Sequence, residues 1–216
     1  MLAPGPPHHR IRLILGIIAI VALLAYSTPA FKIRLAEMAS SAAVTADPIP
    51  QLAVTLAQVP GAHPPTLRAT ITNNNPFAVC LLDYDSPVDA LAIALGLVEL
   101  TPSSPADAAP VQPVDPIRPN RPWPPKVDYL VEVPGGGGAV VSEDIALRAA
   151  YVPYGELGAR FFARMRGPWR AVVAMRKSEI TEEFLERIPE RPNTYQGTYE
   201  SDRIEITVDS AAAELK

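Results

Sequence analysis

The sequence has few of the side chains that most enzymes use for catalysis. Cys80 is the only cysteine, so no disulfide can form within the chain, and the apolar run 77–82 around it predicts a buried, inert thiol. Pairing of this odd cysteine with another molecule is the alternative. His8 and His9 precede a hydrophobic segment, which leaves only His63 in the part expected to fold. A zinc site built from histidine and cysteine is therefore excluded within one chain, and a serine or cysteine nucleophile would have only His63 as its base.

The sequence also lacks a basic surface and the glycine motifs that bind phosphate. The formal charge is −4, and the first 30 residues hold two arginines and no acid, so the rest has 17 basic against 23 acidic residues, or −6. This balance argues against nucleic-acid binding, which depends on contacts with phosphates. No Gly-x-Gly-x-x-Gly or phosphate-loop motif occurs, and Gly135–Gly138 is interpreted as a plain flexible turn. We therefore predict that the protein is not an enzyme and has no catalytic, cofactor-binding or metal-binding residues.

Residues 1–30 have the layout of a secretory signal. Two arginines precede 14 apolar residues (13–26), and small residues follow. As a helix this run is about 21 Å long, shorter than the roughly 30 Å hydrocarbon core, whereas extension to residue 31 gives about 28 Å. We favour a cleaved signal; an uncleaved anchor, with membrane contact only through residues 11–31, is the alternative. Both interpretations place residues 51–210 outside the cytosol, either secreted or held by a single transmembrane helix.

The composition divides the chain into four parts. Residues 32–50 show weak periodicity and end in a proline-containing stretch, which is typical of a linker, and from residue 52 the hydrophobic period changes to two. The predicted organisation is a signal peptide or signal anchor at 1–30, a linker at 31–50, a β-sandwich domain at 51–210 with a proline-rich insertion at 101–126, and a tail at 211–216.

Alternation of apolar and polar residues predicts strands with one face in the core and one in water. The alternating apolar positions are Leu52, Val54 and Leu56, then Leu67, Ala69 and Ile71, and finally Ile204, Ile206 and Val208. Further strands are predicted at 77–82, 88–100, 127–133 (with Val127, Tyr129, Val131 and Val133 on one face), 140–147, 160–166 and 169–175, separated by turns at 60–61, 73–76, 134–138 and 167–168. The pattern predicts an all-β fold, an immunoglobulin-like or fibronectin-like antiparallel β-sandwich of about seven to eight strands. One short helix at 180–188 and an N-terminal hydrophobic helix complete the prediction.

Proline recurs at every third position from Pro110 to Pro125. A polyproline II helix has three residues per turn, so these six rings would line one edge of an extended segment. One interpretation is a rigid ligand for an aromatic-lined groove, with Arg118, Arg121 and Trp123 as specificity contacts. The other, which we favour, is a stiff loop without a partner, because Pro-x-x-Pro is a common and weak signal. A partner, if the segment has one, is an unknown protein or cell-surface molecule.

Asp83, Asp85 and Asp89 place three acids within seven residues, directly after a predicted strand. Such a cluster can bind calcium through oxygen ligands. It can also end the strand in a solvated turn formed by Ser86 and Pro87, which is the interpretation we favour. The same acids are the candidates for a carboxylate-based hydrolase, although nothing in the sequence selects a catalytic pair.

The strand pattern resembles the propeptide-type β-domain that precedes the catalytic domain in fungal deuterolysin-type zinc metalloproteases. The resemblance rests on the runs 52–59, 67–73 and 81–89, with weaker similarity at 131–135, 140–147 and 167–172. No catalytic domain follows and the His-Glu-x-x-His zinc motif is missing, so protease activity does not carry over; the proline-rich insertion is also foreign to that pattern. The resemblance implies a fungal, secretory-pathway, non-catalytic sandwich.

Three functions follow from these observations. The first is a non-enzymatic binding or structural module of unknown ligand, secreted or tethered to a membrane. The second is an inhibitor or folding partner of a separate protease, by analogy with a prodomain. The third is a carboxylate-based hydrolase on a sandwich scaffold.

Overall fold

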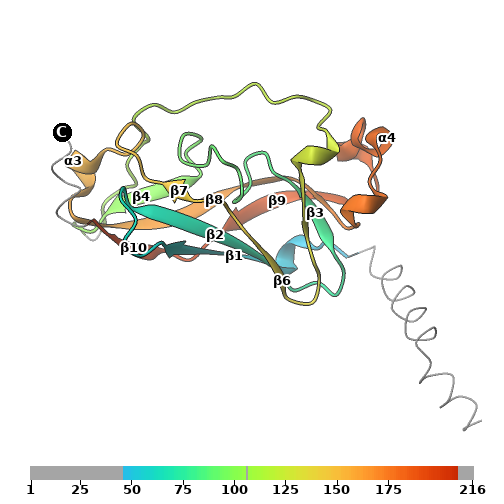
Figure 1. The fold of residues 1–216 in the computed structure, drawn as a ribbon, viewed down its shortest axis with the longest axis horizontal. Coiled ribbons are helices and arrows are strands. Elements are labelled where there is room, and N and C mark those ends of the chain that lie inside the picture. The colour runs from blue at the N-terminus through green and yellow to red at the C-terminus, as the bar shows by residue number, and fades with distance from the viewer. Residues whose placement is uncertain (1–45, 106, 209–216) are drawn as a thin grey trace, which may run out of the picture. The chain divides into compact units, whose positions relative to one another are not determined.

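One sheet of the fold is built around β2. The computed structural model describes residues 46–105 and 107–208. Strands β1 (Leu52–Gln58), β2 (Thr66–Asn73) and β6 (Gly138–Val141) lie side by side in that order, and the short β7 (Ile145–Ala146) also pairs with β2. All these pairs are antiparallel. The strand predicted at 140–147 is thus divided into β6 and β7 (Figure 1).

The second sheet is built around β8 (Arg160–Val173), a strand of 14 residues. Its order is β10, β8, β3, β5, and β4 and β9 also pair with β8. Every pair is antiparallel. The bounds of these strands are β3 (Val79–Leu82), β4 (Val98–Pro102), β5 (Leu130–Val133), β9 (Thr194–Glu200) and β10 (Ile204–Thr207). Four strands therefore pair directly with β8.

The predicted alternation is confirmed in β1, β2 and β10. The inward side chains of β2, at positions 67, 69 and 71, have no exposed surface, and Val54, Leu56 and Ile206 are also buried. The residues between the inward positions of β1 are exposed. These apolar faces form the core of an all-β, immunoglobulin-like antiparallel sandwich, as predicted, although the described residues contain ten strands rather than seven or eight.

The turn predicted at Gly167 and Pro168 is wrong, because β8 runs through both residues. Proline is tolerated in a strand where a neighbouring strand is missing. Between Met165 and Val172 neither β4 nor β3 pairs with β8. Gly167 makes room for a ring, since a Cβ at this position would lie 2.7 Å from the hydroxyl oxygen of Tyr199. Gly167 and Pro168 therefore do not end the strand, and Gly167 leaves the space that the ring of Tyr199 occupies.

The apolar run predicted as one strand at 88–100 is divided, and its greater part forms successive turns that precede β4. The turns begin at Asp89, whose main-chain oxygen accepts the N–H of Ala92 at 3.0 Å. Its carboxylate Oδ1 accepts the N–H of Leu91, also at 3.0 Å. Gly96, with a φ of +73°, lies at their end. Most of the apolar side chains of the run are still buried, so their hydrophobicity reflects core packing without a strand.

The stretch predicted as a strand at 127–133 begins with a 3-10 turn, η3 (Val127–Tyr129), and continues as β5. The turn changes which side chains share a face. Leu130 and Val133 are buried in β5, whereas Val131 is only half-buried. The predicted common face therefore does not include all four odd-numbered residues, because Val127 and Tyr129 lie in the turn and pack against a different hydrophobic cluster from Val133.

The sequence patterns missed β9 and overextended the helix. β9 alternates tyrosine and glycine with polar residues, which gives little hydrophobic period, yet it pairs with β8. The helix predicted at 180–188 is confined to α4 (Glu182–Leu185), where the hydroxyl of Thr181 accepts the N–H of Phe184 at 3.2 Å. A further one-turn helix, α3 (Tyr154–Leu157), was not predicted. The remaining 3-10 turns are η2 (Ile49–Gln51), η4 (Lys177–Glu179) and η5 (Ile188–Glu190).

The four-glycine turn between β5 and β6 is constrained, which corrects its interpretation as a plain flexible turn. A Cβ on Gly135 would lie 2.6 Å from the carbonyl carbon of Phe77, so any side chain would collide with the main chain of the neighbouring turn. Gly136 and Gly137 have φ angles of +69° and +86°. These lie in the left-handed region that residues with a side chain rarely adopt.

Two buried amide side chains tie this turn to three other parts of the chain. Nδ2 of Asn73 donates to the main-chain oxygens of Phe77 at 2.9 Å and Val133 at 3.1 Å. Oδ1 of Asn73 accepts the N–H of Asn75 at 3.0 Å and its Nδ2 at 2.8 Å. Nδ2 of Asn75 also donates to the main-chain oxygen of Pro48 at 3.0 Å. The pair therefore joins the ends of both sheets through hydrogen bonds of buried amide groups.

The predicted targeting segment lies outside the described residues. This applies to the hydrophobic helix, to most of the linker at 31–50 and to the tail at 211–216. Among the helices that the structure describes, none has the length and hydrophobicity needed to cross a membrane.

We expect Gly135→Ala to lower the free energy of unfolding by about 1–3 kcal/mol, because the added methyl group must displace the main chain of Phe77. Gly155→Ala is the matched control, since a Cβ there meets no atom within 4 Å. Urea denaturation of both variants measures the difference. Equal stability of the two variants would show that the close approach at Gly135 does not constrain the turn.

Candidate binding surface on the proline-rich strap

The proline-rich segment, residues 107–126, is named the strap. Figure 1 shows it along the outer edge of the domain, with no other described element beyond it. Three main-chain N–H groups of the strap donate to carbonyl oxygens of the sandwich. The pairs are Val111 with Leu100 at 2.8 Å, Val114 with Tyr151 at 3.0 Å and Ile117 with Ala94 at 2.9 Å. Each donor directly follows a proline, so the three-residue period of the sequence is also the period of attachment.

The first attachment covers part of the edge of β4. Leu100 of β4 forms an isolated antiparallel bridge with Val111. Pro110 and Pro113 flank this bridge and have no N–H to donate, so the bridge cannot extend into a full strand. The strap therefore covers a sheet edge without becoming part of the sheet.

The side chain of Arg121 clamps the second half of the strap. Its Nη2 lies 2.5 Å from Oδ2 of Asp89, whose side chain is 3% exposed. The guanidinium carbon lies 4.9 Å from the centre of the Tyr84 ring, a cation–π contact. The hydroxyl of Tyr84 in turn donates to the main-chain oxygen of Pro122 at 3.3 Å. Arg121 is thus turned toward the domain, and its predicted role as a specificity contact for a partner is wrong.

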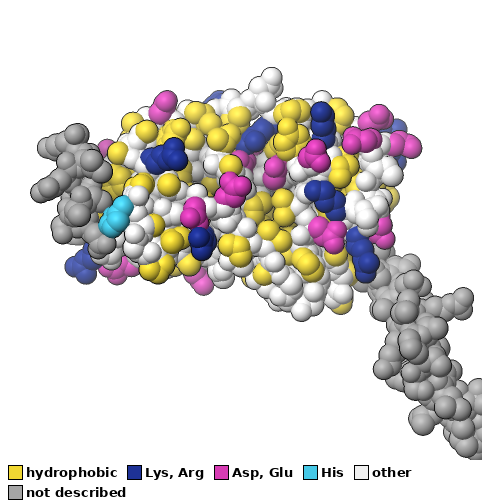
Figure 2. Space-filling model, in the orientation of Figure 1, with side chains coloured by type: hydrophobic (Ala, Val, Ile, Leu, Met, Phe, Trp, Pro, Cys, Tyr) yellow, Lys and Arg dark blue, Asp and Glu magenta, His cyan; other side chains and the backbone are white. Residues whose placement is uncertain are grey.

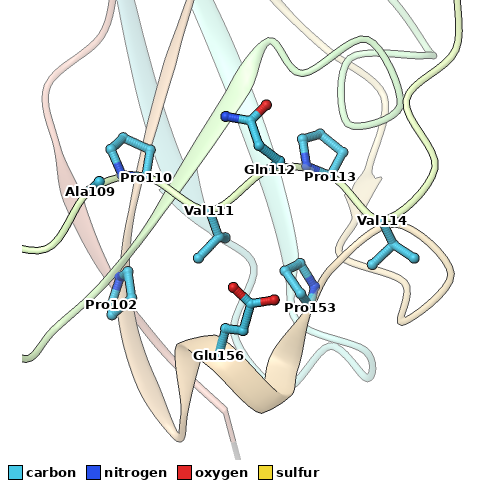
Figure 3. A pocket seen from close by; sticks show the side chains of 9 residues that line it. All are labelled: Pro102, Ala109, Pro110, Val111, Gln112, Pro113, Val114, Pro153 and Glu156. Carbon is cyan, nitrogen blue, oxygen red and sulfur yellow. The ribbon is translucent and has the colours of Figure 1, made fainter.

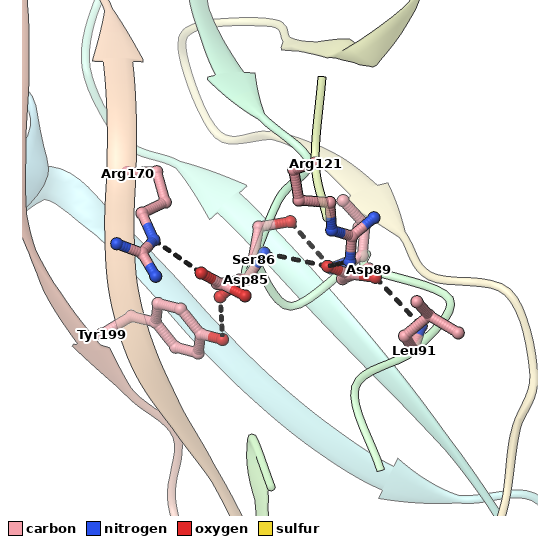
Figure 4. A network of polar contacts seen from close by, with 8 residues as sticks. Asp85, Ser86, Asp89, Leu91, Arg121, Arg170 and Tyr199 are labelled. Atoms are coloured by element: carbon pink, nitrogen blue, oxygen red, sulfur yellow. Dashed lines mark hydrogen bonds and ion pairs between the residues drawn. The ribbon is translucent and has the colours of Figure 1, made fainter. Parts of the chain in front are cut away.

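The carboxylates of Asp85 and Asp89 are occupied by donors from the chain itself (Figure 4). Oδ2 of Asp89 accepts the N–H of Asp85 at 2.9 Å in addition to Arg121. The carboxylate of Asp85 accepts Nε of Arg170 at 2.5 Å, and its main-chain oxygen accepts the hydroxyl of Tyr199 at 2.8 Å. Within the described ranges, no three acids, histidines or cysteines are grouped so that they could hold a metal ion. The carboxylates of Asp85 and Asp89 therefore each bind an arginine of the chain itself.

Asp83 differs from its two neighbours because it is partly buried without an arginine bound to it. Burial, followed by the nearby carboxylate of Asp89, raises the pKa of Asp83 to about 6, and the charge of Arg121 opposes this shift. Oδ1 of Asp83 and Nε of Arg121 are both buried without a hydrogen-bond partner. Asp83 and Asp89 thus share one guanidinium group, so the negative charge of Asp83 is only partly balanced by the positive charge of Arg121.

An open groove lies beside the first half of the strap, with a volume of about 700 Å³. Figure 3 shows the strap on one side and α3 with the preceding proline on the other, with the side chain of Glu156 extending from α3 toward Val111. Four proline rings line it, those of Pro102, Pro110, Pro113 and Pro153, together with Ala109, Val111, Gln112, Val114 and Glu156. The groove therefore combines proline and valine side chains with polar surface, which includes Gln112 and the one acid at its wall, Glu156.

The strap carries the most exposed large apolar side chains of the described domain. Val114 is 57% exposed and Trp123 is 55% exposed, close to the 54% of Val141 on β6. Arg118 is exposed. Figure 2 shows hydrophobic side chains, among which prolines are counted, gathered along the upper edge of this face with single basic side chains between them. Trp123 and Arg118 are thus both accessible on the surface of the strap.

The cysteine and histidine of the domain lie away from the strap. Cys80 in β3 has no exposed surface, and burial raises the pKa of its thiol to about 12, so the predicted buried thiol is confirmed. His63 lies in the loop between β1 and β2, beside a smaller cavity of about 320 Å³ that Gln58 and Thr207 also line.

The fold and the strap define an immunoglobulin-like sandwich with a proline-rich insertion between β4 and β5. The model of the immunoglobulin-like domain family matches residues 51–208. The chain therefore belongs to the immunoglobulin-like domain family. No curated protein matched the sequence.

The clamp of Tyr84, Asp89 and Arg121 is the part of the site that sequence reasoning missed. Arg121 is separated from Asp89 by 32 positions, and no local pattern pairs them. The available signal was the position of Tyr84 between two acids, because an aromatic ring beside carboxylates suits a guanidinium group. Sequence reasoning identified the strap and the acids as separate features, and the structure brings them together.

We expect Arg121→Ala to lower the free energy of unfolding by about 1–2 kcal/mol, because the buried carboxylate of Asp89 loses its charged partner. The strap should also loosen. Hydrogen exchange of the Val114 and Ile117 amides, both bonded to the sandwich, should accelerate. Arg148→Ala, which removes an exposed arginine outside the strap, is the control and should change neither quantity. Unchanged exchange in Arg121→Ala would mean that the clamp does not hold the strap.

Asp83 makes stability depend on pH. Its folded pKa of about 6 lies above its ordinary value, so the protonated acid contributes stability below about pH 4, and this contribution is lost as the pH rises through 6. We expect Asp83→Asn to be more stable than the wild type by about 1 kcal/mol at pH 7.5, after allowance for solvent screening, and equal to it near pH 4. Urea denaturation at both values, with the exposed Asp128→Asn as control, measures the effect. A stability difference that does not change with pH would contradict it.

Proposed function

We propose that the protein is a non-enzymatic immunoglobulin-like module outside the cytosol that binds a partner through the outward side of the strap. The observation that carries the proposal is the attachment of the strap. Its inward side is held by three main-chain hydrogen bonds and the Arg121 clamp, while Trp123 and Arg118 are left exposed. An exposed tryptophan on a stiff segment is a favourable anchor for a protein interface.

The family supports the non-catalytic part of the proposal, because immunoglobulin-like sandwiches commonly serve as binding or structural modules. The acids of the 83–89 turn give little support to the alternative of a carboxylate-based hydrolase. Asp85 and Asp89 are each paired with an arginine, which occupies carboxylate oxygens that a substrate would have to approach. A general acid needs a proton to donate and an approach for the substrate.

The location outside the cytosol is supported by the hydrophobic segment at 13–26, which precedes the domain. The lone cysteine agrees with either compartment, since the domain needs no disulfide. The resemblance to the propeptide-type domain of deuterolysin-like proteases supports the same location and suggests an inhibitor or folding partner of a separate protease as the second candidate. Inhibition of a purified zinc metalloprotease by the protein would favour this candidate.

The experiment that tests the proposal compares three forms of the tagged full chain recovered from its native secretion route. One is the wild type, one carries Pro116, Pro119 and Pro122 changed to Ala, and one carries Pro60, Pro76 and Pro192 changed to Ala. All six prolines lie at exposed or half-buried positions, and the last three lie outside the strap. The variant at Pro60, Pro76 and Pro192 is the control. Proteins that bind the wild type and this control, but not the strap variant, are candidates for the partner.

Each candidate is then purified and its affinity for the three forms is measured by calorimetry. We expect at least a tenfold loss of affinity for the strap variant, because alanine removes both the stiffness and the rings of the segment. Sequencing of the N-terminus of the recovered chain shows whether the hydrophobic segment is cleaved. Equal binding by all three forms would reject the strap as the binding surface.

A further inference from the structure

The strap has a charge pattern that the sandwich does not use. Its first half carries the acids Asp107 and Asp115 and no basic residue, whereas its second half carries Arg118, Arg121 and Lys126 and no acid. Arg121 is bound to Asp89. The other four charged side chains are exposed, and the ion pairs of the described structure include none of them. The strap is therefore bipolar along its length, and its outward charges have no partner within the domain.

We propose that two copies of this chain associate through their straps, which lie antiparallel about a twofold axis between Pro116 and Ile117. The inference rests on the proposed binding role of the strap and names its partner as a second copy. A twofold contact uses the same surface on both molecules, so that surface must be complementary to itself. An antiparallel pair of bipolar segments satisfies this requirement, because the acidic half of each faces the basic half of the other.

The spacing of the charges fits one register. With the axis between Pro116 and Ile117, Asp115 of each copy lies opposite Arg118 of the other, one residue from the axis. Asp107 then lies opposite Lys126 in the same register, near the ends of the two segments. Both charge pairs therefore follow from a single placement of the axis, in which every exposed charge of the strap meets an opposite charge.

The same register brings the exposed tryptophan to the groove. Trp123 of each copy lies opposite Pro110 of the other, and Pro110 lines the groove of about 700 Å³. Three more proline rings line the groove. Its acid, Glu156, belongs to α3, which forms the wall opposite the strap (Figure 3). The exposed tryptophan and the proline rings of the groove thus cover each other in one arrangement.

Access and charge permit this contact. Figure 1 shows the strap at the outer edge of the domain, so a second strap can approach it from outside. The described domain has 14 basic and 20 acidic residues, so two copies repel each other at long range. At physiological ionic strength this repulsion is screened beyond about 8 Å, whereas the paired charges would be in contact. Exposed ion pairs contribute little affinity and mainly set the register, so burial of Trp123 should supply most of it.

Sedimentation velocity of the full chain, between about 1 and 300 µM and in one fixed detergent for all variants, tests the proposal. We expect a concentration-dependent dimer for the wild type and at least a tenfold weaker dimer for Trp123→Ala. Val141→Ala, which shortens an equally exposed apolar side chain on β6, is the matched control and should sediment like the wild type. Association that depends on residues 1–45 would persist in every variant, so only the difference at Trp123 supports the proposal.

A charge exchange tests the register separately. Arg118→Asp places two acids opposite each other at both sites and should weaken the dimer severalfold. The double variant Asp115→Arg with Arg118→Asp restores the opposite pairing and should return the affinity to that of the wild type within about threefold. A double variant as weak as the single one overturns the antiparallel register.

A wild type that remains monomeric up to the highest concentration overturns the dimer. If such a monomer still binds another protein in a way that depends on the strap prolines, the proposed function stands and its partner is a different protein. If neither association depends on the strap, both proposals fail.

Discussion

The pairing of four strands with β8 is the constraint on which the rest of the domain depends. β10 and β4 both pair with the first half of β8, on opposite sides, and β9 and β3 both pair with its last residues, again on opposite sides. Gly167 and Pro168 lie between the part of β8 that pairs with β4 and β10 and the part that pairs with β3, and β9 pairs with both residues. The strand continues through them because Tyr199 of β9 fills the space above Gly167 and packs on Trp169, with ring centres 4.7 Å apart. A break at this point would separate the two halves of the second sheet.

A continuous series of polar contacts leads from this sheet to the strap. Arg170 of β8 and the hydroxyl of Tyr199 both bind Asp85, which fixes the turn after β3. The N–H of Asp85 donates to Asp89, and Asp89 holds Arg121. Each link joins residues that are distant in the sequence or at the two ends of a turn, as Figure 4 shows. The position of the second half of the strap is therefore set by the second sheet, and changes in that sheet should reach the strap through this turn.

The sequence predicts those parts of the fold in which one face of a strand meets the core and the other meets water. β1, β2 and β10 meet this condition, and their inward residues were identified by alternation alone. The run at 88–100 was predicted as a strand because its residues are apolar. They are apolar because the turns they form are buried, and a buried turn is as hydrophobic in sequence as a strand. β9 was missed because Tyr and Gly at its inward positions carry little hydrophobic signal. At the candidate site, the sequence identifies the charges of the strap but cannot tell whether an arginine faces the domain or the solvent. That direction is decided for Arg121 by Asp89 and Tyr84, which are brought near only by the tertiary fold.

Prolines at every third position give the strap two properties that suit a binding surface. They remove N–H groups, so the segment can lie against β4 without being absorbed into the sheet. They also fix the main chain, and the three hydrogen bonds to the sandwich restrict it further. A flexible peptide loses this conformational freedom only when it binds, and the loss lowers its affinity. The strap has already lost it on folding, at the expense of the stability of the domain. A modest set of outward contacts, chiefly one tryptophan and a few charges, can therefore bind more tightly from this segment than from a free peptide of the same sequence.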